Sequence, residues 1–393
     1  MSGHTRRWFV AAVGLGALAG CTGTPQGDGG DGPSGGGGEV DGGSGGGDQG
    51  APRTPAGNGT EGGAAGTGSI VEDLPTADER LPLPTSPTDL QNSALSGGPA
   101  KDGIPSIDDP SFIAPAEVDF LDPGDPVFGV TRGDAVKAYP RKILAHHEIV
   151  NDTLDGDPVA VTYCPLTGTA QGFERGATTF GVSGRLINNN LVMYDRATDA
   201  WWPQILATSI PGPWHESPPI VSLREFQVVW TTWGQWRALH PETDVLSTAT
   251  GHARNYRADP YGSYNPKGGY YTSDSTLFPP MNEDDRFHPK RGVVGARTPA
   301  GAVAFDKEAV RRAGTMTGTL GETPVLAVAD PRLGSVYVYE NPQERTFALD
   351  GVSVVDADGG THPPDGLPLD RLVAFDAMWF AWSGYYPDSN VYA

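Results

Sequence analysis

Hydrophobic residues between positions 141 and 150 recur with the spacing of an amphipathic helix. One face of a 3.6-residue wheel carries Ile143, Leu144, His147 and Val150. Pro140 suits a first helical position, because the N–H that proline lacks would be unused there. The pattern therefore predicts a short helix that turns the imidazole of His147 towards the core, with His146 and Glu148 on either side of the buried face.

Shorter apolar runs elsewhere predict strands. The β-branched run from Pro158 to Tyr163 is typical of a buried strand, and it ends at Cys164 and Pro165. The stretch 181–195 predicts two strands joined by a turn of three asparagines, and 232–240 predicts another short helix. Cys164 is thus expected where a buried strand gives way to a turn.

The same pattern occurs a second time when the chain is shifted by 166 residues. Without a gap, Val127–Val130 falls on Val293–Ala296, Ala138-Tyr139 on Ala304-Phe305, Pro158-Val159 on Pro324-Val325, and Pro165 and Gly168 on Pro331 and Gly334. At another offset, Trp233 and Trp236 match Trp379 and Trp382. An ordered series of matches indicates an internal duplication.

The two copies differ in their polar residues. His147 corresponds to Ala313 although the apolar face around it is kept, and Cys164 corresponds to Asp330. The further differences are His146 to Arg312, Glu148 to Gly314, Asn151 to Thr317 and Asp152 to Gly318. We interpret the first copy as the functional half and the second as its packing partner.

These patterns predict a β-rich α+β fold of two tandem related subdomains, each with short antiparallel strands and a few short helices. We assign 101–255 to the first repeat, 256–284 to a connecting loop and 285–393 to a second, degenerate repeat. The connecting loop is rich in Tyr, Gly and Pro, so its rings either line a groove or pin the loop to the body.

Residues 1–21 have the features of a twin-arginine lipoprotein signal. Arg6 and Arg7 precede an apolar run, 10–19, that is too short to span a bilayer, and small residues then lead to Cys21. The alternative is an ordinary signal peptide with an incidental Cys. We expect Cys21 to be lipidated, so that the membrane is a partner through this anchor and the protein lies at the cell surface, on the outer face of the cytoplasmic membrane.

Residues 22–98 contain almost no large apolar side chains and consist mainly of Gly, Ser, Pro, Thr and Asp. Such a segment cannot bury enough surface to offset its chain entropy, which predicts a disordered tether. Lipidation of Cys21 would leave Cys164 as the one free thiol of the two cysteines, and this excludes an internal disulfide.

The net charge of the chain limits the classes of partner that it can bind. The formal net charge is −21, and Lys occurs only at 101, 137, 142, 267, 290 and 307. This acidic, Lys-poor composition resembles that of halophilic proteins, in which carboxylates keep the surface hydrated. It also argues against nucleic acid as a partner, because phosphates would be repelled. Whether a small molecule or a cell-envelope component is the ligand, and what the oligomeric state is, stay open.

Three interpretations of the polar cluster remain open. In the first, Cys164 is a nucleophile, His147 or His146 its base, and Asp152 or Glu148 the residue that orients the base, with Asn151 nearby. In the second, Cys164, His147 and His240 bind copper or zinc, with His252 or Met193 as further ligands. In the third, Cys164 and His147 only fill the core of a non-catalytic surface binding or structural module.

Several motifs resemble one family. The segments KDGIP, HEIVND, TYCPLTGTA, FGVSGRL, LVMYDRATDAWW and DPYGSY, from Lys101 onwards, are together similar to the domain of unknown function 3179 family, in a haloarchaeal-type form with an N-terminal lipoprotein signal. The resemblance covers roughly 102–393 and implies a shared fold without a particular substrate. Many relatives carry a second Cys where this chain has Thr167, so the departure argues against a dithiol or a CxxC zinc site here.

Overall fold

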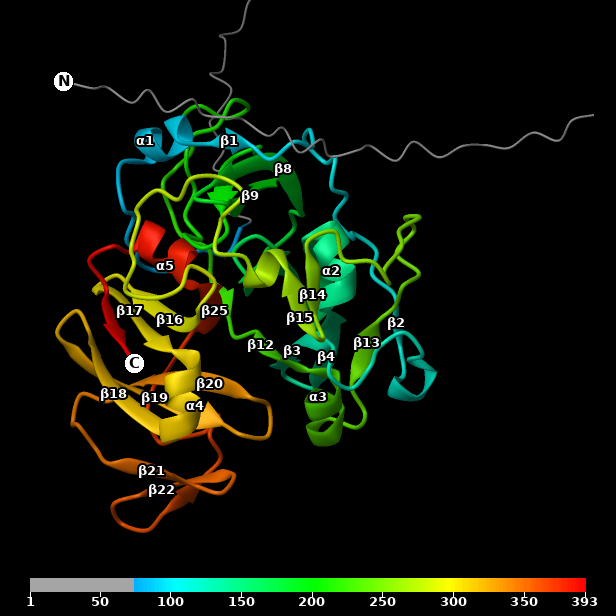
Figure 1. The fold of residues 1–393 in the computed structure, drawn as a ribbon. Coiled ribbons are helices and arrows are strands. Elements are labelled where there is room, and N and C mark those ends of the chain that lie inside the picture. The colour runs from blue at the N-terminus through cyan, green and yellow to red at the C-terminus, as the bar shows by residue number, and fades with distance from the viewer. Residues whose placement is uncertain (1–73) are drawn as a thin grey trace, which may run out of the picture. The chain divides into compact units, whose positions relative to one another are not determined.

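The structure is a computed structural model that describes residues 74–393 (Figure 1). The expected signal and most of the tether lie outside the described residues. The described part is rich in antiparallel strands with a few short helices, as the sequence predicts. Within 74–393, no helix is both long and apolar enough to cross a membrane.

The first half of the described chain builds two sheets around helix α2. Their elements are β3 (Pro126–Arg132), β4 (Ala135–Pro140), α2 (Arg141–His147), β5 (Ile149–Leu154), β6 (Asp157–Cys164), β7 (Thr169–Glu174), β11 (Glu225–Phe226), β12 (Val229–Thr232), α3 (Trp233–Leu239) and β13 (Asp244–Leu246). With β2 (Phe112–Ile113) at one edge, the orders are β12-β3-β4-β13-β2 and β11-β7-β6-β5. β13 pairs with β4 in parallel, and the other pairs are antiparallel.

The second half follows the same order of elements. They are β16 (Gly292–Thr298), β17 (Gly301–Asp306), α4 (Lys307–Ala313), β18 (Thr315–Leu320), β19 (Thr323–Asp330), β20 (Ser335–Glu340), β24 (Arg371–Leu372), β25 (Ala374–Met378), α5 (Trp379–Tyr385) and β26 (Asn390–Tyr392). Their sheets have the orders β25-β16-β17-β26 and β18-β19-β20-β24. Here too the last strand is the parallel one, β26 against β17.

The remaining elements connect or cover these sheets. A fifth sheet, β1-β8-β9-β10, lies beside α1 at the top of Figure 1. The bounds are α1 (Pro87–Asn92), β1 (Leu95–Ser96), η2 (Pro115–Glu117), β8 (Phe180–Ile187), β9 (Asn190–Asp195), β10 (Trp201–Pro203), β14 (Gly262–Tyr264), β15 (Lys267–Gly269), η3 (Tyr270–Thr272), β21 (Phe347–Asp350), β22 (Ser353–Asp356) and β23 (Thr361–His362). The β14–β15 hairpin and η3 belong to the segment that joins the two halves.

Most predicted elements are confirmed, with exceptions in the tether and in the first helix. The end of the predicted tether 22–98 contains α1 and β1, and Leu90 of α1 is fully buried. β6, the β8–β9 hairpin and α3 occupy the predicted stretches. The predicted helix face extends to Val150, which is wrong: α2 ends at His147, and Val150 lies in β5. The helix stops because Glu148 leaves the right-handed region with a φ of 59°.

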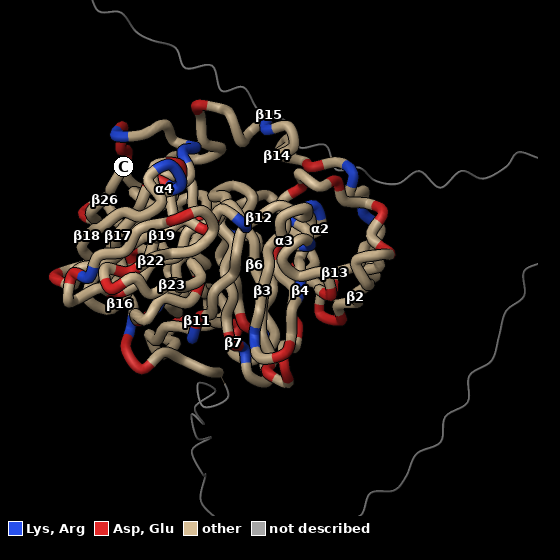
Figure 2. The backbone as a smooth tube through the Cα atoms, turned by 90° about the horizontal axis from the view of Figure 1, so that it is seen from below, with Lys and Arg blue, Asp and Glu red and all other residues tan. Residues whose placement is uncertain are grey.

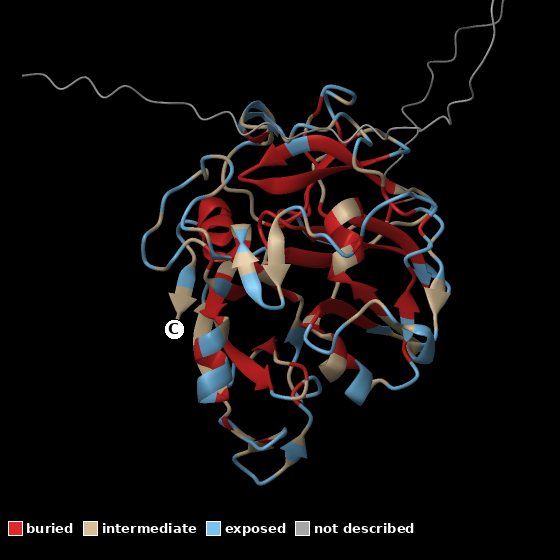
Figure 3. Cartoon of the chain, turned by 45° about the vertical axis from the view of Figure 1, so that its right-hand side comes forward, coloured by how far each residue is buried: buried red, intermediate tan, exposed pale blue. Residues whose placement is uncertain are grey.

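The core lies between the sheets, and charge lies mostly outside it. Figure 3 shows the central strands and α5 buried, while the connecting loops are largely exposed. In Figure 2, Asp and Glu are distributed mainly along loops at the margins of the described part. This arrangement keeps the carboxylates of an acidic chain in water, where they cost little.

Candidate functional site

Cys164 ends β6 at a turn that the rest of the molecule covers. Its side chain is 1% exposed, and the thiol donates a hydrogen bond to the backbone carbonyl of Asn189, with a distance of 3.6 Å. Burial and the neighbouring Glu148 raise the thiol pKa to about 11, while hydrogen bonding from Thr167 and the backbone amide of Leu191 acts in the opposite direction. The resting group is therefore a protonated thiol.

Glu148 is the carboxyl that lies near this thiol. It is 6% exposed, and no hydrogen bond to its carboxyl group occurs within the described residues. Burial raises the pKa of Glu148 to about 8, so the group holds its proton over much of the neutral range. A carboxyl with this pKa is suited to proton transfer near neutrality.

The backbone of Glu148 is strained. Its φ of 59° and ψ of −30° lie outside the regions that residues with a Cβ ordinarily adopt. Two short hydrogen bonds fix this conformation: its N–H donates to Leu144 over 2.8 Å, and its carbonyl accepts from Tyr163 over 2.7 Å. In the second half Gly314 makes the equivalent pair of bonds with a φ of 83°. A glutamate where glycine would be unstrained points to a role for its side chain.

A buried ion pair and several tyrosines lie next to this pair of residues. Arg141, at the start of α2, is 3% exposed and bonds Asp259 over 2.5 Å and the hydroxyl of Tyr271 over 2.9 Å. The Arg141 Nε and the Tyr163 hydroxyl are buried without a hydrogen-bond partner in the described part of the chain. Unpaired buried polar atoms are costly, so this cluster retains unused hydrogen-bonding capacity beside Cys164.

Segments distant in sequence cover the thiol. The Tyr270 hydroxyl donates to the Leu166 carbonyl over 2.8 Å, which fixes the connecting segment onto the turn after Cys164. From the second half, the amide of Met378 donates to the Thr167 carbonyl over 2.8 Å, and Tyr385 of α5 donates to Ile187. The site is therefore enclosed by the connecting segment and by the second half together.

The predicted pairing of Cys164 with His147 is not found. His147 is fully buried, as predicted, but its Nδ1 lies 2.7 Å from the Pro105 carbonyl and its Nε2 lies 2.6 Å from the Tyr256 hydroxyl. Both ring nitrogens are thus occupied, and burial lowers the His147 pKa to about 4. The Nε2 of His146 bonds the Ala258 carbonyl over 2.8 Å. The two histidines hold neighbouring loops against α2.

Asn151 and Asp152 have structural partners. Asn151 bonds both the N–H and the carbonyl of Phe180, which ties β5 to β8. The carboxylate of Asp152 accepts from Lys137 over 2.9 Å and from the Tyr139 hydroxyl over 2.6 Å. Of the predicted catalytic residues, Glu148 is the one whose charge acts on the Cys164 thiol, whereas the side chains of the others hydrogen-bond elsewhere.

The proposed metal ligands do not fit a copper or zinc centre. Among residues 74–393, no group of three His, Cys, Asp or Glu side chains is arranged to hold a metal ion. His147 has no free nitrogen, and the ring of His240 packs on Trp236 with 4.1 Å between centroids. No metal-dependent step follows from these residues.

Sequence reasoning did not identify Arg141, Asp259, Tyr163 or the covering role of Tyr270. Asp259 and Tyr270 come from the connecting segment, more than 90 residues from Cys164, and no local pattern links them to it. One signal for Glu148 was present. Its counterpart is Gly314, and a glycine just after a helix is typical of a positive φ.

Comparison with known proteins identifies one relationship. No curated protein and no solved structure matches the chain. The model of a family described as "Protein of unknown function (DUF3179)" matches residues 101–389, which include both halves and the Cys164 region. The chain therefore belongs to the DUF3179 family.

Proposed function

We propose that the first half is a thiol-dependent catalytic centre in which Cys164 is the nucleophile and Glu148 its general base. The observation that carries the proposal is the strained, buried Glu148, which lies beside the thiol at a position where the second half has glycine. Backbone strain of this kind persists where function requires a particular side chain. Glu148 thereby replaces the histidines as the expected base.

The chemistry is addition of the thiol to an electrophilic carbonyl carbon. Glu148, in its ionised form, accepts the Cys164 proton while the sulfur forms a bond to the carbon and the carbonyl π electrons move to oxygen. Collapse of this adduct expels a leaving group that takes the proton back from Glu148. Because Cys164 is enclosed, the covering segment around Tyr270 must move before a substrate reaches the sulfur.

The test is the rate at which Cys164 is alkylated by iodoacetamide as a function of pH. The full chain is used in a Cys21→Ser background, so that Cys164 is the one remaining cysteine. We expect a rate that rises through an inflection near pH 8, and we expect Glu148→Gln to remove that inflection and slow the reaction about tenfold at pH 8. Mass spectrometry of the modified peptide identifies the site.

His147→Gln is the matched control, because it changes a buried titratable neighbour that the proposal does not use. It should keep the inflection near pH 8. If Glu148→Gln reproduces the wild-type profile, Glu148 is not the base and the catalytic proposal fails. Alkylation that requires denaturant at every pH would instead favour the non-catalytic binding module.

We further infer that the two halves are copies of one unit, with the site kept in the first. In support, β3 begins at Pro126 and β16 at Gly292, 166 positions later, and the next five elements keep this spacing. The parallel closing strand has the same register in both halves, Val245 opposite Ala138 and Val391 opposite Ala304. In the second half Asp330, at the position of Cys164, is buried in an ion pair with Arg332.

The cellular location is also part of the proposal. We propose that Cys21 carries lipid and holds the domain on the outer face of the cytoplasmic membrane, after twin-arginine export of the folded chain. The support is the order of Arg6-Arg7, the apolar run and Cys21 in the sequence. Cys21→Ser should release the protein from the membrane fraction, and membrane retention as firm as that of the wild type would exclude the anchor.

A further inference from the structure

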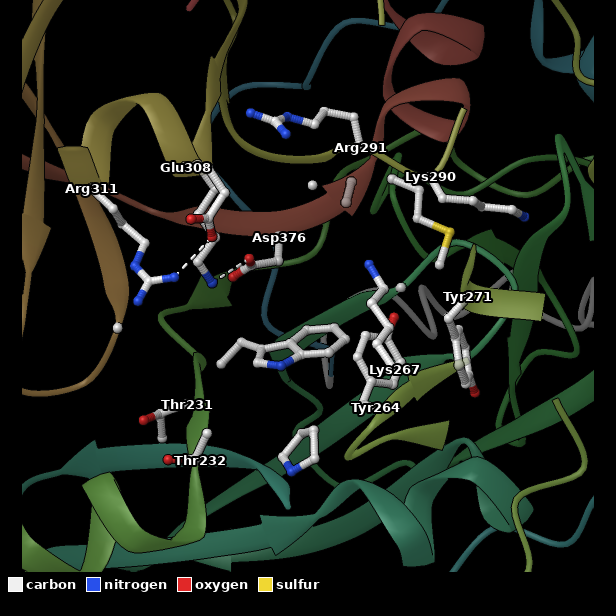
Figure 4. A pocket seen from close by; sticks show the side chains of 18 of the residues that line it. Thr231, Thr232, Tyr264, Lys267, Tyr271, Lys290, Arg291, Glu308, Arg311 and Asp376 are labelled. Atoms are coloured by element: carbon white, nitrogen blue, oxygen red, sulfur yellow. Dashed lines mark hydrogen bonds and ion pairs between the residues drawn. The ribbon is translucent and has the colours of Figure 1, made fainter. Parts of the chain in front are cut away.

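A cavity of about 590 Å³ lies between the two halves, apart from the Cys164 site. Its walls come from β12 and the β14–β15 hairpin on one side and from β16, α4 and β25 on the other (Figure 4). Cys164 and Glu148 are not among the residues that line it. Cavities of this size are typical of sites for small organic ligands.

This cavity concentrates the few lysines of an acidic chain. Lys267, Lys290 and Lys307 all line it, which is half of the six lysines in a protein of net charge −21. Arg291 and Arg311 also line it. Because these cations gather in one cavity, the charge of its lining is opposite in sign to the net charge of the whole chain.

Most lysines of the chain are neutralised by a carboxylate, but two are not. Lys101, Lys137, Lys142 and Lys307 pair with Asp199, Asp152, Asp125 and Asp376. Lys267 and Lys290 have no carboxylate within ion-pair distance in residues 74–393, and both line this cavity. The buried Nζ of Lys290 has no hydrogen-bond partner either, and it lies 3.2 Å from the ring centroid of Tyr270.

The carboxylates that line the cavity are already paired with cations. Asp376 pairs with Lys307 over 2.5 Å, and Glu308 with Arg311 over 2.8 Å. Burial, and then the nearby charge of Lys267, lower the Lys290 pKa to about 7. An anion bound beside Lys267 would therefore favour the charged form of Lys290 and would supply a hydrogen-bond acceptor to the Lys267 ammonium group.

Aromatic rings form the adjoining wall. The rings of Trp230 and Tyr264 lie 5.4 Å apart between centroids, and Tyr264 lies 4.2 Å from Tyr271. Figure 4 shows Lys267 on the same side as Tyr264 and Tyr271, opposite Asp376. Because an inorganic ion would fill only a small part of this space, the ligand needs an apolar body that packs on the rings.

We propose that the cavity between the halves binds a small organic anion, with its phosphate or carboxylate group held by Lys267, the nearby charge of Lys290 adding to the attraction, and a flat apolar body packed against Trp230 and Tyr264. This site is separate from the Cys164 centre and does not depend on its activity. The opposite charge of the cavity also steers anions towards it in an otherwise repulsive field.

Isothermal titration calorimetry of the full chain with three probes tests the proposal: phenyl phosphate, benzoate and inorganic phosphate. We expect phenyl phosphate or benzoate to bind at least tenfold more tightly than inorganic phosphate, and the tighter of the two identifies the charged group. Lys267→Gln should weaken binding of that probe about tenfold or more, since Lys267 is exposed and its replacement should not disturb folding.

Lys101→Gln is the matched control, because it removes a lysine paired with Asp199 outside the cavity. It should leave the affinity unchanged, and so should Cys164→Ala. Equal effects of Lys267→Gln and Lys101→Gln would overturn the proposal. So would binding of phenyl phosphate and benzoate no tighter than that of inorganic phosphate, or no heat of binding from any probe at millimolar concentration.

Discussion

At the scale of single residues, the backbone strain at Glu148 lowers the stability of the fold, while its carboxyl group serves the proposed function. A residue with a Cβ at such φ and ψ values costs about 1–3 kcal/mol, whereas glycine is unstrained there and loses about 0.5–1 kcal/mol of chain entropy. We expect Glu148→Gly to stabilise the fold by about 1 kcal/mol in urea unfolding and to abolish the Glu148-dependent alkylation of Cys164.

Glu148→Ala is the control, since it removes the carboxyl but keeps the Cβ and therefore the strain. It should be less stable than Glu148→Gly by about 1 kcal/mol. In the second half, Gly314→Ala should act in the opposite direction, because a Cβ there would lie 2.8 Å from the Cβ of Leu349 at a φ of 83°. An equal stability for the Ala and Gly variants of Glu148 would show that its backbone is relaxed.

Glu148 also predicts how stability depends on pH. Its folded pKa of about 8 is above the ordinary value of 4.5, so between these limits the folded state keeps a proton that the unfolded chain has released. Rising pH therefore favours unfolding across that window, by roughly 1.4 kcal/mol per pH unit for one such group. Below pH 4.5 and above pH 8 the contribution is constant.

The measurement is the unfolding free energy of the wild type and of Glu148→Gln at a series of pH values. The difference between the two isolates Glu148, since His147 has the opposite effect. The lowered His147 pKa of about 4 stabilises the fold above pH 6.5 and loses that contribution as the pH falls towards 4. A difference that does not change between pH 5 and 8 would mean that Glu148 is ionised in the folded protein.

The residue types in the sequence were enough to identify part of the candidate site. Cys164 and Glu148 were both candidates, because the second half lacks them, but the base was assigned to histidine on chemical preference. The choice between Glu148 and His147 depends on whether each side chain already has partners. Those partners are the Pro105 carbonyl and the Tyr256 hydroxyl, and no spacing rule indicates that they lie beside α2.

At the scale of elements, the connecting segment covers Cys164, and we expect it to control access to the thiol. The hydrogen bond from the Tyr270 hydroxyl to the Leu166 carbonyl holds it over the thiol. Tyr270→Phe removes one hydrogen bond worth about 1 kcal/mol, so we expect alkylation of Cys164 by iodoacetamide at fixed pH to become about fivefold faster. Tyr261→Phe is the control, since no hydrogen bond of the Tyr261 hydroxyl occurs in the described part. Equal rates for all three proteins would show that access is controlled elsewhere.

Helices and strands were predictable where the hydrophobic period was unbroken, as in β6 and α3. The end of α2 was not, because an apolar residue at 150 continued the helical spacing across the strained turn at Glu148. The sequence left open whether the aromatic rings of the connecting segment line a groove or pin the segment to the body, and the packing in the structure answers this. Tyr270 and Tyr271 bond to the body and pin the segment there, while Tyr264 also forms a wall of the cavity between the halves.

At the scale of the whole molecule, the second half of the chain helps to enclose the site of the first half. The second half supplies Met378 and α5 as part of the cover over the turn after Cys164. The cavity with the unpaired lysines also requires residues from both halves. The fold class was accessible from the sequence because hydrophobic periods and repeats are local, whereas the contact between the halves depends on surfaces that no single segment encodes.

Both halves contain a glycine packed against a tryptophan, and this packing gives a test of their equivalence. A Cβ on Gly129 would lie 2.2 Å from the Trp236 ring, and one on Gly295 would lie 2.0 Å from the Trp382 ring. Both rings are fully buried, so neither can move aside without displacing its neighbours. We expect Gly129→Ala and Gly295→Ala each to destabilise the fold by about 1–3 kcal/mol in urea unfolding. Gly292→Ala is the control, since Gly292 also has no positive φ and no atom lies within 4 Å of its Cβ position. If only one of the two changes is costly, the halves do not share this packing and the inference of two equivalent units is contradicted.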